Sequence, residues 1–159
     1  MKLYIKQKAF SIGDKYDIYD INQNIVFNVE SELFTIGAKL HLMDTLGNEL
    51  YYIRKRITFM LARYEIYSKN TLYAVVSQEF SFFKPKLVVE SAYGRFNISG
   101  NFLSRDYDIT KNGSYFGSVH KKWLSWGDSY ELDIPHNEDA AFFCALVIAI
   151  DNCLHNEND

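Results

Sequence analysis

The amino-acid sequence predicts a mainly β protein, a closed antiparallel barrel of about twelve strands around a central hydrophobic C-terminal helix. Two observations support this prediction. Most of the chain repeats a pattern of strand, turn and strand, and the run AAFFCALVIAI, residues 140–150, contains no polar side chain. Aromatic residues make up 16% of the chain, with 12 Tyr and 12 Phe, and this abundance favours strands.

An internal repeat supports the strand prediction. The segment FSIGDKYDI, residues 10–18, returns as FTIGAKLHL, residues 34–42. The correspondence continues, because Asp20 matches Asp44 and Asn24 matches Asn48. Each unit holds two strands in 24 residues, whereas a propeller blade needs about four strands and ~40 residues. A meander that closes into a barrel fits better, since closure removes exposed strand edges.

The expected strands follow one another as hairpins. Polar turn residues interrupt the alternating stretches at INQN (21–24), TLGN (45–48), KN (69–70) and KNGS (111–114), and a further hairpin runs through residues 86–102. Asn112-Gly113 is the strongest of these turn signals, because both residues tolerate positive φ in a two-residue turn. Hairpins joined in sequence order predict that consecutive strands are neighbours around the barrel.

A helix is expected after the last strand. Pro135 to Asn137 mark a break, with Asn137 as the expected N-cap. Glu138 and Asp139 are then expected in the first turn, where the helix dipole favours negative charge. From there to His155 the chain reads as a helix that is apolar on every side through its middle. Such a helix needs burial all round.

The barrel and the helix are expected to complete each other. A barrel of about twelve strands has a lumen too wide for its own side chains to fill, and the helix needs a surrounding wall. A membrane span is excluded, because eleven apolar residues cover only ~16 Å and Asp139 and Asp151 flank them. The residues expected in the core are Phe142, Phe143, Leu146, Val147 and Ile150.

Composition predicts one domain over residues 1–159, since no Pro-rich or Gly-rich linker divides the chain. The net charge of −3 conceals an asymmetry. Residues 128–159 hold eight carboxylates and no Lys or Arg, so residues 1–127 carry 17 basic against 12 acidic side chains. A basic body favours an anionic partner such as lipid headgroups. An ordinary mixed surface with an acidic tail is the alternative, and no nucleic-acid partner is expected.

The two cysteines indicate a reducing environment. Cys144 and Cys153 lie nine residues apart; on one helix this places them ~13 Å apart, beyond the ~7 Å reach of a disulfide. Core packing is the expected role of Cys144. The start MKLYIKQK lacks a secretory apolar region. We therefore expect a cytoplasmic protein without a transmembrane segment, and a peripheral location at the membrane follows if it binds lipid headgroups.

Seven stretches carry a resemblance to a known family. They are KQKAFSIGDKYDIYD, GNELYYIRKR, YEIY, FSFFK, GNFLSRDYDITKNG, VHKKWLSWGDSYELDI and ALVIAIDNCLH. On these stretches, which run from end to end, the chain resembles the LURP-one-related family, whose Tubby C-terminal-like fold is related to phospholipid scramblases. The resemblance implies a twelve-stranded barrel around a hydrophobic C-terminal helix. It implies no established activity, and a connection to lipids only by analogy with Tubby and scramblase relatives.

Signatures of catalysis are absent from the sequence. There is no GxSxG, HExxH, Walker A or GxGxxG motif, and the four His residues are scattered. We therefore expect no catalytic residue, no metal and no cofactor. Three basic clusters, YYIRKR, FFKPK and HKKWLSW, have aromatic neighbours, which suits a membrane surface as well as a solvated barrel exterior. The candidate residues for binding a lipid headgroup or another anion are Arg54, Arg56, Lys84, Lys86, Lys121, Lys122 and Trp123.

Two functions from different classes remain open at this point. The first is a non-enzymatic binding module that recognises anionic phospholipid headgroups, or another anionic ligand, through a basic barrel face. The alternative is a structural or protein-interaction domain that engages a protein partner and has no lipid role. A scramblase-like enzyme is a third and weaker hypothesis, because no calcium-binding motif is present.

Overall fold

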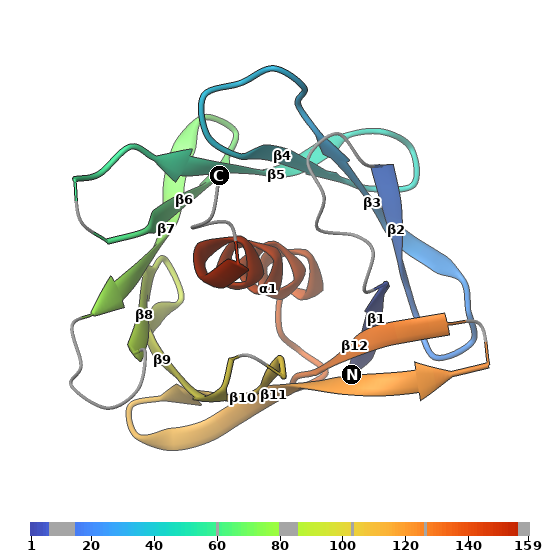
Figure 1. The fold of residues 1–159 in the computed structure, drawn as a ribbon. Helices are drawn as coiled ribbons and strands as arrows, with labels where there is room; N and C mark the ends of the chain where they lie inside the picture. Colours follow the sequence, from blue (N-terminus) through green and yellow to red (C-terminus); the bar gives the residue numbers. More distant parts are fainter. Residues whose placement is uncertain (7–14, 60, 80–85, 103, 126, 156–159) are drawn as a thin grey trace.

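The structure is a computed structural model that describes residues 1–6, 15–59, 61–79, 86–102, 104–125 and 127–155. Over these residues the chain forms a closed barrel of twelve antiparallel strands, in which each strand pairs with the next and β1 pairs with β12 (Figure 1). The fold class predicted from the sequence is confirmed. The strands are β1 (Lys2–Lys6), β2 (Lys15–Tyr19), β3 (Ile25–Ser31), β4 (Lys39–Met43), β5 (Glu49–Arg56), β6 (Arg63–Ser68), β7 (Thr71–Glu79), β8 (Lys86–Ser91), β9 (Gly94–Asn101), β10 (Asp106–Lys111), β11 (Ser114–Leu124) and β12 (Gly127–Asp133).

Two hairpins close with two-residue turns of positive φ. Lys69 and Asn70 have φ of 48° and 64°, and Asn112 and Gly113 have φ of 52° and 78°. The flanking residues of each turn pair directly across it. Such turns match the right-handed twist of the strands that they join. The hairpin predicted at Asn112-Gly113 is therefore confirmed.

The repeat in the sequence has a structural counterpart in two turns. Between β2 and β3, the Asp20 carboxylate accepts hydrogen bonds from the amide N–H groups of Asn22 and Asn24, both at 2.8 Å, and from Asn24 Nδ2 at 2.9 Å. Between β4 and β5, the Asp44 carboxylate accepts the equivalent bonds from Leu46 and Asn48 at 2.8–2.9 Å. These bonds, above all those from the two Asn side chains, lower the pKa of both carboxyl groups. Both turns therefore carry negative charge at neutral pH.

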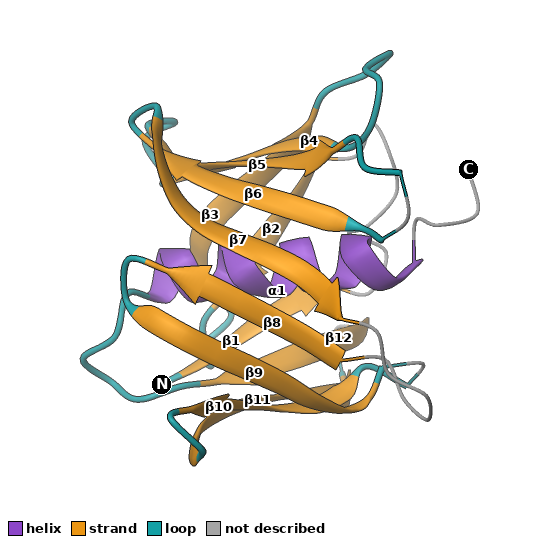
Figure 2. Cartoon of the chain, turned by 90° about the vertical axis from the view of Figure 1, so that its left-hand side faces the viewer, coloured by secondary structure: helices purple, strands orange, loops and turns teal. Residues whose placement is uncertain are grey.

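The helix α1 (Ala140–His155) runs through the lumen along the barrel (Figure 2). Alternation along the strands directs one side chain in two toward it, and the side chains at the inner positions form one core with the helix. The five residues predicted for the helix core have at most 1% exposure. Cys144 and Cys153 are buried and are not joined in a disulfide. In the described part of the chain, no helix combines the length and the hydropathy that a transmembrane span requires.

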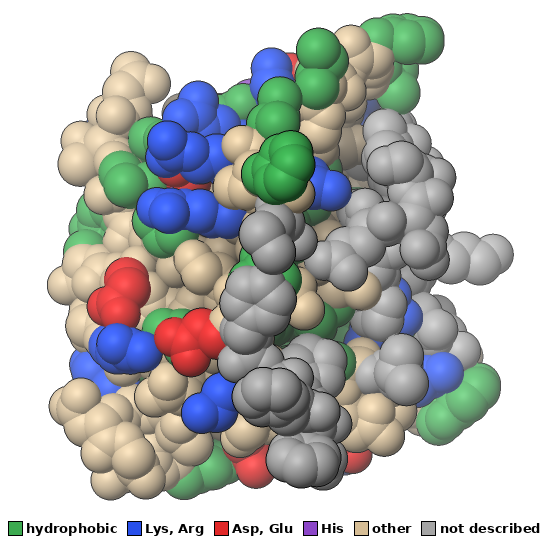
Figure 3. Space-filling view, turned by 60° about the vertical axis from the view of Figure 1, so that its left-hand side comes forward, with side chains coloured by type: hydrophobic (Ala, Val, Ile, Leu, Met, Phe, Trp, Pro, Cys, Tyr) green, Lys and Arg blue, Asp and Glu red, His purple; other side chains and the backbone are tan. Residues whose placement is uncertain are grey.

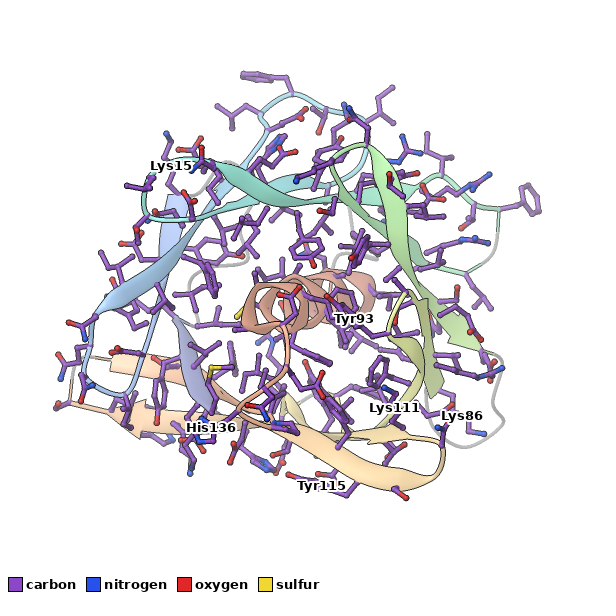
Figure 4. All side chains as sticks on the ribbon, turned by 180° about the vertical axis from the view of Figure 1, so that it is seen from behind. Lys15, Lys86, Tyr93, Lys111, Tyr115 and His136 are labelled. Carbon is purple, nitrogen blue, oxygen red and sulfur yellow. The ribbon has the colours of Figure 1, made fainter. Side chains whose placement is uncertain are left out.

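The start of the helix corrects one expectation. The N-cap is Asp139, not Asn137, because Asp139 Oδ1 accepts the amide N–H of Phe142 at 2.9 Å. No acidic side chain lies in the first turn. The physical reason is that Asp139 Oδ2 also accepts the hydroxyl hydrogens of Tyr51 and Tyr93, at 2.6 and 2.8 Å. Tyr93 projects toward the helix from the barrel wall (Figure 4). These two bonds fix Asp139 at the mouth of the lumen, so that the helix begins with the next residue.

A second carboxylate fixes the other end of the helix. Asp151, with a side chain only 4% exposed, accepts hydrogen bonds from the guanidinium of Arg105 in the β9–β10 connection. Arg105 Nη1 also donates to the hydroxyl of Tyr130 at 3.1 Å. Close by, Cys153 Sγ lies 3.7 Å from the carbonyl oxygen of Ala62. The last turns of α1 therefore lie beside the β5–β6 connection, and the apolar run is tied to the barrel at both ends.

Candidate anion-binding surface

Two adjacent strands position a group of arginines on the outside of the barrel. In β5, Tyr51 and Ile53 are buried toward the helix, and Arg54 and Arg56 alternate onto the outer side. Strand pairing places Arg54 opposite Glu65 and Arg56 opposite Arg63. We call Arg54, Arg56 and Arg63, together with Glu65, the β5–β6 arginine cluster.

Glu65 is the centre of this cluster and is 1% exposed. Its Oε2 accepts Arg54 Nε at 3.0 Å and Arg54 Nη2 at 2.9 Å, and its Oε1 accepts Arg56 Nη1 at 2.8 Å. The hydroxyl of Tyr67 donates to Oε2 at 2.7 Å. Burial raises the pKa of Glu65, but the hydrogen bonds from Tyr67, Arg56 and Arg54 outweigh it and lower the pKa to about 2.

The third arginine leaves the cluster with a surplus of positive charge. Arg63 Nε is buried and has no hydrogen-bond partner among the described residues. Arg54 and Arg56 share the Glu65 carboxylate, and Arg63 lies opposite Arg56 in the strand register, so three positive charges stand against one negative charge in the cluster. An arginine is permanently charged and presents its N–H groups in a planar fork that matches phosphate and carboxylate oxygens.

Charges on the neighbouring strands are more evenly balanced. Arg95 of β9 lies 3.5 Å from Glu79 and 3.2 Å from Glu90. Lys86, a predicted candidate, is exposed at the start of β8, opposite Glu79 in the register (Figure 4). On this side of the barrel, Lys and Arg side chains gather in the upper part and are mixed with carboxylates below (Figure 3). Among the described residues on this side, the surplus of positive charge is thus greatest over β5 and β6.

The predicted candidates on β11 belong to a different surface. Lys122 lies 3.8 Å from Glu131 of β12, which Lys2 also contacts at 2.9 Å. Lys121 Nζ lies 4.6 Å from the ring centroid of Trp123, which is largely exposed. Five strands separate β11 from β5 in the barrel order. Arg54 and Arg56 therefore do not share a strand pair with Lys121, Lys122 and Trp123, and Lys84 lies outside the described residues.

Two residues of the cluster were missed in the sequence. Arg63 and Glu65 lie two positions apart in RYEIY, so they share a face of one strand. This alternation is a usable signal, but only the register between β5 and β6 shows that this face adjoins Arg54 and Arg56. Elsewhere, the described residues contain no group of three or more His, Cys, Asp or Glu side chains arranged to hold a metal ion.

The structure defines the class as a closed antiparallel barrel that encloses a C-terminal helix, and comparison with known proteins specifies the family. The chain belongs to the LURP-one-related family, whose model matches residues 1–151. It is 35% identical over 159 residues to the uncharacterized protein YxjI of Bacillus subtilis (strain 168), a match that covers 100% of this chain and 97% of that protein.

Plant relatives extend the comparison. Protein LURP-one-related 10 of Arabidopsis thaliana is 23% identical over 180 residues, covering 100% of this chain and 93% of the relative. An X-ray structure of a protein from Arabidopsis thaliana is similar with a TM-score of 0.66 at 20% identity, covering 95% of this chain and 89% of that one. At this identity the likeness establishes the fold. None of these names states an activity, a ligand or a partner.

Proposed function

We propose that residues 1–159 form a single non-enzymatic binding domain that recognises a phosphate-bearing anion through the β5–β6 arginine cluster. The ligand that we favour is an anionic phospholipid headgroup. The observation that supports this proposal is the surplus of positive charge in the cluster, in which two arginines share one buried carboxylate and a third, Arg63, lies opposite Arg56. An ion-pair network with a purely structural role needs no surplus of charge, whereas a binding surface for anions does.

Arg63 gives the proposed site a specific point of contact. Its buried Nε–H has no acceptor among the described residues, and an unsatisfied buried donor costs about 1–3 kcal/mol. Because Arg63 is only half-buried, a shift of its side chain toward a phosphate oxygen would give this N–H an acceptor and remove the cost. Arg54 and Arg56 are already oriented by Glu65, so that little side-chain freedom is lost when the anion binds. Lys86 extends the positive charge at the same side of the barrel, and the cytoplasmic face of a membrane is the proposed location.

Vesicle co-sedimentation at low salt tests this proposal. The wild type is expected to bind vesicles of phosphatidylcholine with phosphatidylserine or phosphoinositide, and not vesicles of phosphatidylcholine alone. Arg63→Gln removes one surplus charge without breaking a hydrogen bond of Glu65, and is expected to weaken binding about fivefold, since one basic residue contributes ~1 kcal/mol at an anionic surface. Arg95→Gln, which removes an exposed arginine paired with two carboxylates, is the matched control.

A charge-balanced variant separates surplus charge from the ion pair itself. Arg54→Gln with Glu65→Gln removes one positive and one negative charge, so the surplus remains and binding should persist. Wild-type protein that ignores anionic vesicles at low salt, or Arg63→Gln protein that binds them like the wild type, would contradict the proposal. The first of these results would favour a structural or protein-interaction domain.

A further inference from the structure

Two neighbouring connections expose large apolar side chains to an unusual degree. The β3–β4 connection (residues 32–38) exposes Phe34 at 102%, and the β5–β6 connection (residues 57–62) exposes Phe59 at 101%. Both rings are therefore as accessible as in an extended chain. Single exposed apolar residues are common on protein surfaces, but here several share two adjacent connections. We call the following residues the apolar rim: Leu33, Phe34, Ile36, Ile57 and Phe59.

The two connections are held side by side at their bases. The amide of Lys55, near the end of β5, donates to the carbonyl oxygen of Ala38 at 2.8 Å. A Cβ atom at Gly37 would lie 3.3 Å from Lys55 Cβ, so the two backbones approach closely there. Phe34 adopts a φ of 58°, a conformation that bulky residues rarely take, and residues in such conformations cluster at functional sites.

The apolar rim lies at the same end of the barrel as the arginine cluster. Arg56 immediately precedes the β5–β6 connection and Arg63 immediately follows it, so two guanidinium groups flank Ile57 and Phe59. Cys153 of α1 contacts Ala62 of this connection. In Figure 2 the helix finishes at this end, where loops extend beyond the strands. The Glu32 carboxylate in the other connection is paired with Lys39 Nζ at 3.4 Å and His41 Nε2 at 2.9 Å, so it does not oppose the positive charge.

The opposite end of the barrel provides a contrast in charge. Ile21 and Leu46 are exposed there as well, but each follows closely after a turn aspartate, Asp20 or Asp44, whose pKa is lowered by hydrogen bonds. Apolar tips beside carboxylates do not match an anionic surface, whereas apolar tips beside arginines do.

From these observations we infer that the apolar rim inserts into the interfacial region of an anionic bilayer, with Arg56 and Arg63 against the lipid phosphates. This inference rests on the proposed function for the contribution of the arginines and identifies the bilayer surface, rather than a soluble phosphate ester, as the partner. Side chains that protrude singly from separate loops suit a fluid surface, which accommodates any spacing, whereas a folded protein would need a matching pocket for each. Aromatic and aliphatic side chains at headgroup depth gain from burial of apolar area.

The test uses the full chain with phosphatidylcholine vesicles that contain phosphatidylserine, and inositol hexakisphosphate as a soluble probe. Phe34→Ser with Phe59→Ser is expected to weaken vesicle binding at least about tenfold and to leave binding of the soluble probe unchanged. The unfolding temperature should stay at the wild-type value, because both rings are fully exposed. Leu46→Ser removes a comparably exposed side chain from the opposite end and should leave vesicle binding unchanged.

The outcomes separate this inference from the proposed function. Wild-type vesicle binding by the double Phe variant would overturn the insertion of the rim, and the arginine site would survive if Arg63→Gln weakened binding of both vesicles and the soluble probe. Loss of vesicle binding in the double Phe variant, with Arg63→Gln like the wild type, would support the rim and reject the arginine site. A wild-type chain that self-associates in light scattering and ignores vesicles would overturn both.

Discussion

Removal of Arg105 should destabilise the barrel, because the Asp151 carboxylate of α1 would stay buried without the guanidinium that pairs with it. The Asp151 side chain is 4% exposed and that of Arg105 is 22% exposed, so Arg105→Gln leaves a carboxylate with little access to water. Breaking a buried ion pair from one side costs about 3–5 kcal/mol. For a chain of 159 residues, 1 kcal/mol corresponds to about 3 °C in the unfolding temperature, so we expect a decrease of about 9–15 °C.

Two companion variants make this prediction quantitative. Arg105→Gln combined with Asp151→Asn removes both charges and should recover part of the lost free energy of unfolding, because no uncompensated charge remains. Arg95→Gln breaks contacts between side chains that are about half exposed and should cost less than about 1 kcal/mol. Urea unfolding followed by circular dichroism measures all three. A cost for Arg105→Gln no greater than that for Arg95→Gln, or a double variant no more stable than Arg105→Gln alone, would contradict a stabilising role of the buried pair.

Three further perturbations test other parts of the structure. Leu146→Asp places an unpaired charge in the filled lumen and should leave the chain insoluble or unfolded; a folded, soluble variant would contradict the central position of the helix. The folded-state pKa of Glu65 is lowered to about 2. The ionised Glu65 therefore stabilises the fold above its unfolded pKa of about 4.3, and this stabilisation is lost as the pH falls toward 2. Glu65→Gln should flatten the dependence of the free energy of unfolding on pH in this range, as measured by urea unfolding. Gly113→Ala should lower the free energy of unfolding by only about 1 kcal/mol, because Gly113 has a φ of 78° but an added Cβ would meet no atom within 4 Å. Gly100→Ala should lower it more, since its Cβ would lie 2.5 Å from the carbonyl oxygen of Asp106. Equal unfolding temperatures for these two variants would contradict the difference.

The sequence allowed much of the fold to be predicted, because the decisive signals are local. Asn112 and Gly113 are adjacent, and the apolar run of the helix is continuous, so neither depends on distant parts of the chain. The match between Asp20 and Asp44 likewise predicted two turns that the structure shows to be built alike. Because the twelve strands pair in sequence order, their arrangement could be predicted without knowing which distant segments meet.

The errors and omissions arise where distant residues decide the outcome. Asp139 replaces Asn137 as the N-cap because Tyr51 and Tyr93, 88 and 46 positions away, bind its second carboxylate oxygen. Arg63 joins the candidate site only through the register of β6 against β5. Local composition showed where basic residues are concentrated along the chain, but their grouping depends on which strands are neighbours.

The way in which β1 meets β12 constrains how this chain acquires its structure. Lys2 and Glu131, 129 positions apart, form an ion pair across the seam that closes the barrel. The helix that fills the lumen comes after all twelve strands in the sequence. Ribosomal synthesis therefore delivers the whole wall before the core that it encloses, and the nascent strands have no interior to pack against until α1 emerges. Closure across such sequence distances is slow, on the order of milliseconds to seconds, and during this interval the apolar strand faces depend on collapse or on chaperones for protection.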